Sequence, residues 1–181
     1  MSMIKQHGLS LIELLVFIVI VGIAVTGVLS VYSSVTKTSA NPMLQKQALA
    51  VAESLLDEVL SKPYTYCDPD DANADTATSP AGCATTPEGM GTEGTEDRYS
   101  NTMPYDNVND YNGFTMAGIN DLTNTAVPGL GAYNATIRIQ AAGVFNGIPA
   151  GETLIVHVTV TGPDNLPVTL SGYRTRYAPT L

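Results

Sequence analysis

A stretch of 23 residues without a charged side chain constrains this chain more than any other feature. It covers residues 14–36, between Glu13 and Lys37, and consists mainly of Val, Ile and Leu. About 20 apolar residues in a helix are enough to cross the ~30 Å hydrocarbon core of a bilayer. We therefore expect a helix that faces lipid or other apolar helices.

Two ordinary kinds of segment also produce such a run. A secretory signal peptide has a shorter apolar region followed by small residues, whereas here the small residue Gly8 precedes the run. A plain membrane anchor is the other alternative, but a carboxylate near the bilayer centre costs roughly 2.5–3.5 kcal/mol, which disfavours Glu13 there. Cleavage after Gly8 would create an amine at Leu9, and Glu13 could then pair with the amine of a neighbouring subunit.

The segment from Gly8 to Gly22 resembles the class III signal of type IV pilins and type II secretion pseudopilins. The shared features are a short leader that contains Lys5, a glycine before the cut and a glutamate five residues beyond it. The resemblance implies that a prepilin peptidase cuts between Gly8 and Leu9 and then methylates the amine of Leu9. It also implies that Glu13 acts in assembly. The chain departs from the family in having Leu9 where Phe or Met is common, and no proline in the apolar run.

A second apolar stripe extends the helical pattern beyond the uncharged run. Asn41-Pro42 is a typical helix start, and apolar residues then recur at helical spacing. They are Leu44, Ala48, Val51, Leu55 and Val59. Because Pro63 ends the pattern, we expect one long helix over about residues 9–61, kinked near Pro42.

The C-terminal third alternates apolar and polar residues with a period of two, which is typical of half-buried strands. The expected strands lie around 133–140, 154–161 and 168–173. A turn at 162–165 and other short connections predict an antiparallel meander. Its apolar face would cover the stripe 44–59, and His157 would lie on its polar face. The expected fold class is therefore α+β, with a long N-terminal membrane-spanning helix packed against a C-terminal antiparallel sheet, as in type IV pilins.

The segment between helix and strands is acidic and rich in turn-forming residues. Eleven of the 17 acidic residues lie within 64–125, where Arg98 is the only base. Such a composition favours surface loops over packed elements. A disulfide between Cys67 and Cys83 would close a loop of about 15 residues and contribute ~3 kcal/mol. Two free thiols are the alternative, and the lack of histidine partners disfavours a zinc site.

Two groups of oxygen-bearing side chains are candidates for calcium binding. Asp71, Asn73 and Asp75 fit the first three ligands of an EF-hand loop, but Thr76 and Gly82 replace its required Gly and Glu. The second group precedes a glycine and consists of Asp106, Asn107, Asn109, Asp110 and Asn112. Because such runs ordinarily form turns, we expect no cofactor and keep calcium as the alternative.

Composition excludes several classes of function. A net charge of −9, with 8 Lys and Arg, lacks the basic footprint of a nucleic-acid binder. His7 and His157 lie 150 positions apart, which excludes a multi-histidine metal or catalytic centre. The chain also lacks nucleophile-elbow and phosphate-loop motifs, so we do not expect an enzyme.

Three blocks outside the leader are similar to minor pilins of mannose-sensitive haemagglutinin (MSHA) pili. They are residues 42–59, 105–114 and 168–177. The resemblance implies a low-copy structural subunit that initiates or joins a surface fibre used in attachment. Its implied partners are prepilin peptidase, the inner-membrane assembly platform, the membrane, and other major and minor pilins bound through the N-terminal helix. It would be a single-pass inner-membrane precursor with a periplasmic C-terminal domain, and later part of a surface pilus.

Two other functions stay open at this point. One is a type II secretion pseudopilin, and the other is a pilus-tip adhesin that binds a ligand through the acidic loop 64–125.

The expected organisation is a prepilin leader at 1–8, a transmembrane and polymerisation helix at 9–40, its amphipathic continuation at 41–62, an acidic loop region with a disulfide at 63–130, and an antiparallel sheet at 131–181.

Overall fold

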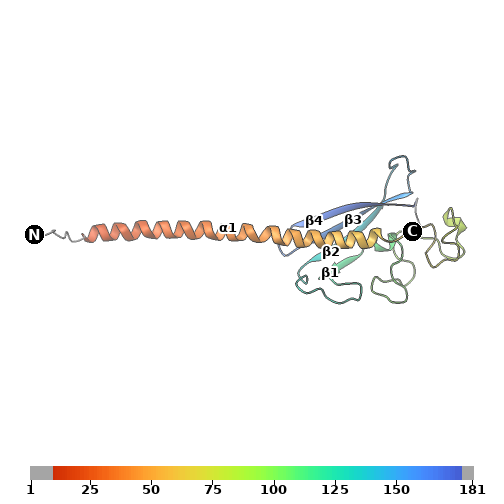
Figure 1. Cartoon of the computed structure of the whole chain (residues 1–181), viewed down its shortest axis with the longest axis horizontal. Coiled ribbons are helices and arrows are strands. Elements are labelled where there is room, and N and C mark those ends of the chain that lie inside the picture. Colours follow the sequence, from red (N-terminus) through yellow and green to blue (C-terminus); the bar gives the residue numbers. More distant parts are fainter. Residues whose placement is uncertain (1–9, 177–181) are drawn as a thin grey trace, which may run out of the picture. The chain divides into compact units, whose positions relative to one another are not determined.

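The computed structural model describes residues 10–176, and over 33–41 it describes the backbone only. Its elements are one long α-helix, two 3-10 helices and four strands (Figure 1). They are α1 Leu11–Leu60, η1 Pro80–Gly82, η2 Asn109–Tyr111, β1 Thr115–Ala117, β2 Asn134–Ala141, β3 Thr153–Thr161 and β4 Pro167–Thr175.

The chain divides into two compact units, Met1–Met43 and Leu44–Leu181. The first contains the N-terminal part of α1, and the second contains the last turns of α1 and all four strands. Pro42 lies inside α1, where it lacks the N–H that would donate to the preceding turn. The long helix expected over about residues 9–61 is present, whereas the kink near Pro42 stays a prediction.

The four strands form one antiparallel sheet in the order β1-β2-β3-β4. This order confirms the meander expected from the alternating pattern and places Ile137 opposite Val158. At the predicted turn between β3 and β4, the N–H of Asn165 donates to the carbonyl of Gly162 at 3.0 Å. Asn165 adopts a φ of 57°, a left-handed conformation that asparagine tolerates better than most residues.

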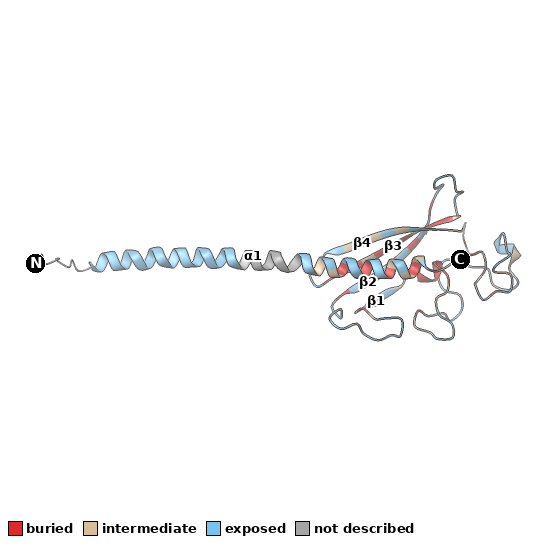
Figure 2. Cartoon of the chain, viewed as in Figure 1, coloured by how far each residue is buried: buried red, intermediate tan, exposed pale blue. Residues whose placement is uncertain are grey.

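The core of the second unit lies between the last turns of α1 and one face of the sheet. In α1 the buried residues are Ala52 and the predicted stripe except Leu44, which is half-buried. In β2 and β3 they are those that point to the helix side (Figure 2). The buried residues are Ala48, Val51, Ala52, Leu55, Val59, Ala135, Ile137, Ile139, Leu154, Val156, Val158 and Val160. The α+β fold expected from two periodicities is therefore confirmed.

The acidic segment contributes more to the core than its composition predicted. Val108, Tyr111, Met116 and Ile119 are buried there, and β1 is a fourth strand that the alternation did not reveal. The expectation that 64–125 forms surface loops is wrong for these residues. The physical reason is that the few apolar residues of this segment gather around η2 and β1, where a strand of three residues is too short to show a period.

Candidate functional site

The first described turn of the first unit carries Glu13. The N–H groups of Glu13 and Leu14 donate to the carbonyl of Ser10 at 3.0 and 3.2 Å, so α1 begins directly after Ser10. A carboxylate in the first turn is favoured by the positive end of the helix dipole, and Glu13 is exposed in the single chain. Gly8 and Leu9, the predicted cleavage and methylation residues, lie outside the described residues.

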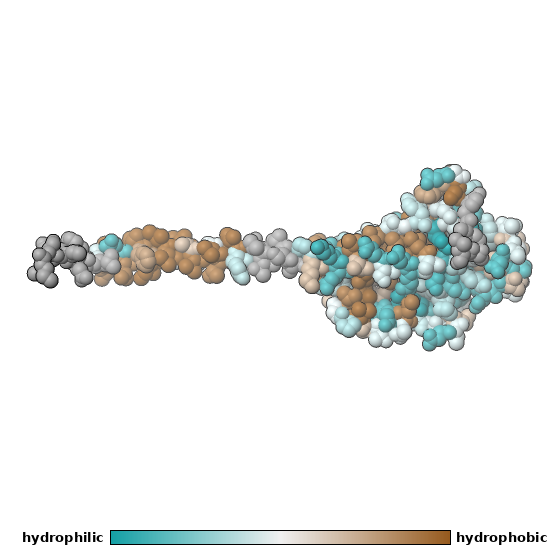
Figure 3. Space-filling view, viewed as in Figure 1, coloured by the Kyte–Doolittle hydropathy of each residue, from teal (hydrophilic) through white to brown (hydrophobic). Residues whose placement is uncertain are grey.

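The segment Leu11–Tyr32 of α1 exposes apolar side chains around its whole circumference. Its length and composition are sufficient for one membrane span, and none of it is buried within the chain. Phe17 is 65% exposed and Ile23 is 68% exposed, and the apolar character continues along the helix surface in Figure 3. A helix that is apolar on all sides requires lipid or other apolar helices around it.

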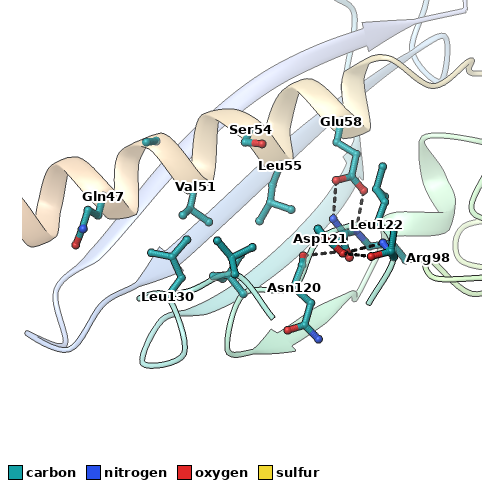
Figure 4. A pocket seen from close by; sticks show the side chains of 14 residues that line it. Gln47, Val51, Ser54, Leu55, Glu58, Arg98, Asn120, Asp121, Leu122 and Leu130 are labelled. Carbon is teal, nitrogen blue, oxygen red and sulfur yellow. Dashed lines mark hydrogen bonds and ion pairs between the residues drawn. The ribbon is translucent and has the colours of Figure 1, made fainter. Parts of the chain in front are cut away.

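In the second unit, a buried ion pair joins the last turns of α1 to the acidic segment (Figure 4). Arg98 donates from Nε and Nη2 to the two carboxylate oxygens of Glu58, each at 2.7 Å. The hydroxyl of Tyr111 donates to the same carboxylate at 2.9 Å. Arg98 also donates to the carbonyl of Asn120 at 3.3 Å. The single base of the acidic segment is thus fully engaged in holding that segment against α1.

Beside this ion pair, α1 and residues 119–130 enclose an apolar groove of about 610 Å³. Figure 4 shows Val51 and Leu55 pointing from α1 into the groove, with Leu130 on the opposite wall. Glu58 and Arg98 in its lining bind each other, and the carboxylate of Asp121 accepts the hydroxyl of Thr123 at 2.7 Å. With Val51, Leu55 and Leu130 in its walls, the groove has the character of an apolar contact surface.

The loop at residues 67–83 is closed by a disulfide between Cys67 and Cys83, as expected. Inside it, the carboxylate of Asp71 accepts the hydroxyl of Thr85 and four backbone N–H groups at 2.6–2.9 Å. The N–H donors belong to Asn73, Ala84, Thr85 and Thr86. These bonds, that of Thr86 first, hold the pKa of Asp71 well below its usual value. Because its oxygens are already used, Asp71 organises the loop and is not available as a calcium ligand.

The second predicted calcium group is only partly assembled by the fold. Oδ2 of Asp110 accepts the backbone N–H groups of Asp106 and Asn107 at 2.9 and 2.7 Å. The side-chain amides of Asn107 and Asn112 form hydrogen bonds to other segments. Asn109 and Asp110, in contrast, each keep a buried oxygen with no hydrogen-bond partner in the described part of the chain.

Two glutamates that the sequence did not single out lie beside Asp110. One carboxylate oxygen from each of Glu88, Glu93 and Asp110 lies within 4.8 Å of the other two. Burial first, and then the charge of Asp110, raises the pKa of Glu88. Burial also raises the pKa of Asp110. The three carboxylates therefore resist being charged together in the absence of a cation.

A second acidic group lies in the same segment and consists of Asp68, Glu96 and Asp106. One oxygen from each again lies within 4.8 Å of the others. Burial, followed by the charge of Asp110, raises the pKa of Glu96 and that of Asp106 to about 7. All three are half-buried and therefore keep contact with water.

No spacing in the sequence connects Glu88 or Glu93 to Asp110, so pattern reasoning missed both glutamates. The sequence did contain one indication of a turn here, namely the glycines between and after Glu88 and Glu93. Gly91 and Gly94 adopt φ values of 120° and 64°, conformations that favour glycine. They let the chain turn back, so that the N–H of Gly89 donates to Oε1 of Glu93 at 2.7 Å.

His157 lies on the half-exposed face of the sheet, on the side that alternation predicted. Its Nδ1 shares a hydrogen bond with the hydroxyl of Ser171 at 2.7 Å. This contact joins β3 to β4 and accounts for the histidine as part of the sheet surface.

Comparison with known proteins identifies the N-terminal segment. Residues 3–29 match the family model described as the prokaryotic N-terminal methylation motif. The match includes residues 3–8 of the predicted leader and more than half of the apolar run 14–36, and it supports a type IV pilin or pseudopilin. An apolar N-terminal helix followed by a four-stranded antiparallel sheet is consistent with the type IV pilin fold. No curated protein and no solved structure matches the chain significantly.

Proposed function

We propose that this chain is a minor type IV pilin of the MSHA type, most similar to MshD. In this role it is a structural subunit that prepilin peptidase cleaves and that initiates or joins a surface fibre used in attachment. The methylation motif at residues 3–29 carries the proposal at the level of a type IV pilin or pseudopilin. The narrower assignment to the MSHA type depends on the similarity of three segments to minor pilins of MSHA pili. These segments are residues 42–59, 105–114 and 168–177.

The chemistry of assembly follows from the motif and from the exposed helix behind it. Cleavage after Gly8 would leave the amine of Leu9 four residues before Glu13. In a helix bundle, the Glu13 carboxylate of one subunit would pair with the Leu9 amine of its neighbour, which offsets the burial of both charges. Packing of the exposed apolar side chains of Leu11–Tyr32 against other helices would supply the driving force. Within the membrane this force comes from van der Waals contacts between helices, because lipid tails are themselves apolar.

The proposed location and partners follow from the same role. The precursor would cross the inner membrane once, with the sheet-containing unit in the periplasm, and would later enter a surface pilus. Its partners would be prepilin peptidase, the inner-membrane assembly platform, and major and minor pilins bound through the N-terminal helix. Residues 1–8 would be the leader and 9–40 the polymerisation helix.

Peptide mass spectrometry of sheared surface fibres tests the proposal directly. We expect a peptide that begins with N-methylated Leu9, at low abundance relative to the major subunit. The protein confined to membranes with residues 1–8 still attached would contradict the assembly role. Recovery of the methylated protein in a secretion assembly, with none in surface fibres, would instead identify a pseudopilin.

A Glu13→Gln variant tests the role of the carboxylate. We expect it to be cleaved but to be lost from fibres, because the Leu9 amine would then be buried without a counter-charge. Glu53→Gln is the matched control, since Glu53 is exposed on α1. Equal incorporation of both variants would show that Glu13 has no part in assembly.

A pilus-tip adhesin is a second candidate, and the exposure of Asp70, Asp75 and Asp97 in the acidic segment favours it. Deleting 68–100 would not test it cleanly, because Arg98 and Cys83 hold the second unit together. Replacing Asp70 and Asp75 with Asn changes the surface charge and leaves both contacts in place. Intact fibres that no longer attach would support binding through this loop.

A further inference from the structure

Four buried side-chain oxygens without hydrogen-bond partners lie in one part of the acidic segment. They are Oε1 of Glu88, Oε2 of Glu93, Oδ1 of Asn109 and Oδ1 of Asp110. Asn109 and Asp110 are each only 2% exposed. Buried polar atoms are nearly always paired in native proteins, so four unpaired oxygens at one place indicate a partner, a proton or a cation, that the described residues do not supply.

Three of the four side chains form a cluster of carboxylates, and the amide of Asn109 lies next to it. Carboxylate oxygens of Glu88, Glu93 and Asp110 lie within 4.8 Å of one another. Nδ2 of Asn109 donates to the carbonyl of Gly89, which places its amide against the backbone beside Glu88. The cluster therefore combines three carboxylates and one amide, and each offers an unpaired oxygen.

Among the described residues, no base forms an ion pair with this cluster. The charged groups that act most strongly on Glu88 are all acidic: Asp110, Glu93, Asp68 and Glu96. Arg98, the only base within residues 64–125, binds Glu58 through both carboxylate oxygens. Three carboxylates buried together repel one another unless a proton or a cation is shared among them.

We propose that Glu88, Glu93, Asn109 and Asp110 bind one calcium ion. All four ligands are oxygens, which are the donors that hard divalent cations prefer. The cluster has no histidine or cysteine, as a zinc site would require. Two oxygens from a loop and two from the short helix η2 suit the flexible coordination of Ca²⁺. Mg²⁺ fits less well, because it demands near-ideal octahedral geometry and retains several waters.

The remaining polar atoms of the cluster hold these ligands in place. Asp110 is anchored through Oδ2 by the backbone N–H groups of Asp106 and Asn107. Glu93 is anchored through Oε1 by the N–H of Gly89, and Asn109 through its Nδ2. Each anchor leaves the other oxygen of the same group free. Such outer hydrogen bonds are typical of side chains that are oriented for a metal.

The ion would clamp two segments of the second unit. Glu88 and Glu93 belong to the loop before Arg98, whereas Asn109 and Asp110 belong to η2. Tyr111, the last residue of η2, is buried in the core and binds Glu58. Calcium would therefore stabilise the contact between the acidic loop and the core of the second unit.

Calcium titration of the full chain in detergent micelles, after treatment with EDTA, tests the site. With calcium chloride as the probe, we expect a saturable rise in the unfolding temperature of the second unit and one ion bound per chain by calorimetry. Magnesium chloride should bind at least ~10-fold more weakly. No binding up to about 10 mM calcium, some tenfold above the weakest affinities of extracellular calcium modules, would overturn the proposal.

A Glu88→Gln variant separates a ligand from a purely structural residue. In EDTA we expect it to unfold at the same temperature as the original chain or higher. Burial and the charge of Asp110 raise the pKa of Glu88 and so favour its neutral form, which glutamine resembles. In calcium the variant should unfold at a lower temperature than the original chain, because removal of a charged ligand weakens calcium binding by about 10-fold or more. The matched control Glu53→Gln should respond to calcium like the original chain. A Glu88→Gln variant that is less stable under both conditions, or that binds calcium normally, would overturn the proposal.

Discussion

Glu58 and Arg98, forty residues apart in the chain, meet in a two-pronged ion pair in which both N···O distances are 2.7 Å. The Arg98 side chain is 3% exposed and that of Glu58 is 15% exposed. The pair joins the final turns of α1 to a segment that has little regular structure of its own. Because both charges are largely removed from water, each depends on the other.

Glu58→Gln is expected to destabilise the second unit by about 3 kcal/mol, because removing one partner leaves a buried charge uncompensated. Thermal unfolding of the full chain in detergent micelles, followed by near-ultraviolet circular dichroism of the tyrosines, measures the loss. In the double variant Glu58→Gln, Arg98→Met, the loss should be smaller than the sum of the two single effects. Strict additivity would show that the pair has no coupling energy.

Gly172 in β4 is expected to tolerate no side chain without adjustment. A Cβ built there would lie 2.7 Å from Cδ1 of Leu60 and 3.3 Å from Cδ1 of Leu56. We predict that Gly172→Ala destabilises the second unit by about 1 kcal/mol, the low end for overpacking, because a leucine methyl can move. Denaturant unfolding measures the change.

A control and a rescue accompany this variant. Gly143 is exposed and a Cβ there meets nothing within 4 Å, so Gly143→Ala should be neutral. The double variant Gly172→Ala, Leu60→Ala should lose less stability than the single variant Leu60→Ala. The reason is that the methyl group introduced in place of the Gly172 hydrogen would fill part of the cavity left by the leucine side chain. If Gly172→Ala were as neutral as the control, close packing of α1 on β4 would be contradicted.

Replacing Cys67 and Cys83 with serine is expected to reduce stability by about 3 kcal/mol, from the loop-closure entropy of ~15 residues. Amide hydrogen exchange within residues 67–83 should accelerate most, because the bridge closes that loop. A reducing agent should lower the stability of the original chain and leave the double variant unchanged. Equal stability of oxidised and reduced protein would contradict a structural role for the bridge.

Asp71 is expected to make its loop sensitive to acid. Its pKa is lowered by hydrogen bonds from Thr86, Ala84 and other backbone N–H groups, so its contribution to stability is complete above its ordinary pKa of ~3.9 and declines as the pH falls below that value. The stability difference between the original chain and Asp71→Asn should therefore be largest near pH 6 and shrink between about pH 4 and pH 2.

Asp75→Asn serves as the control for this comparison, because Asp75 is an exposed acidic residue of the same loop. Unfolding measured at several pH values should show a small and pH-independent effect of Asp75→Asn. A constant difference between Asp71→Asn and the original chain down to pH 2 would contradict the role assigned to the Asp71 carboxylate.

The sequence by itself determined the elements that repeat. Three local patterns were readable: the uncharged run 14–36, the stripe from Leu44 to Val59, and the alternation in β2 and β3. Each arises within a single helix or strand whose faces contact the same surroundings along its length. Burial confirms the stripe and the alternation, and the antiparallel order of β2, β3 and β4 followed from short connections. With two cysteines in the sequence, a single disulfide was the one bridge possible, and the structure decided between it and two free thiols.

Only the tertiary structure decided which residues meet within the acidic segment. Arg98 could have paired with any of many carboxylates, and it binds Glu58 because the fold brings α1 to it. Glu88 and Glu93 reach Asp110 through turns at glycines, at separations that follow no period. Loop contacts of this kind depend on the whole path of the chain and on the burial of charge at the end of that path, and neither is a property of a local sequence window.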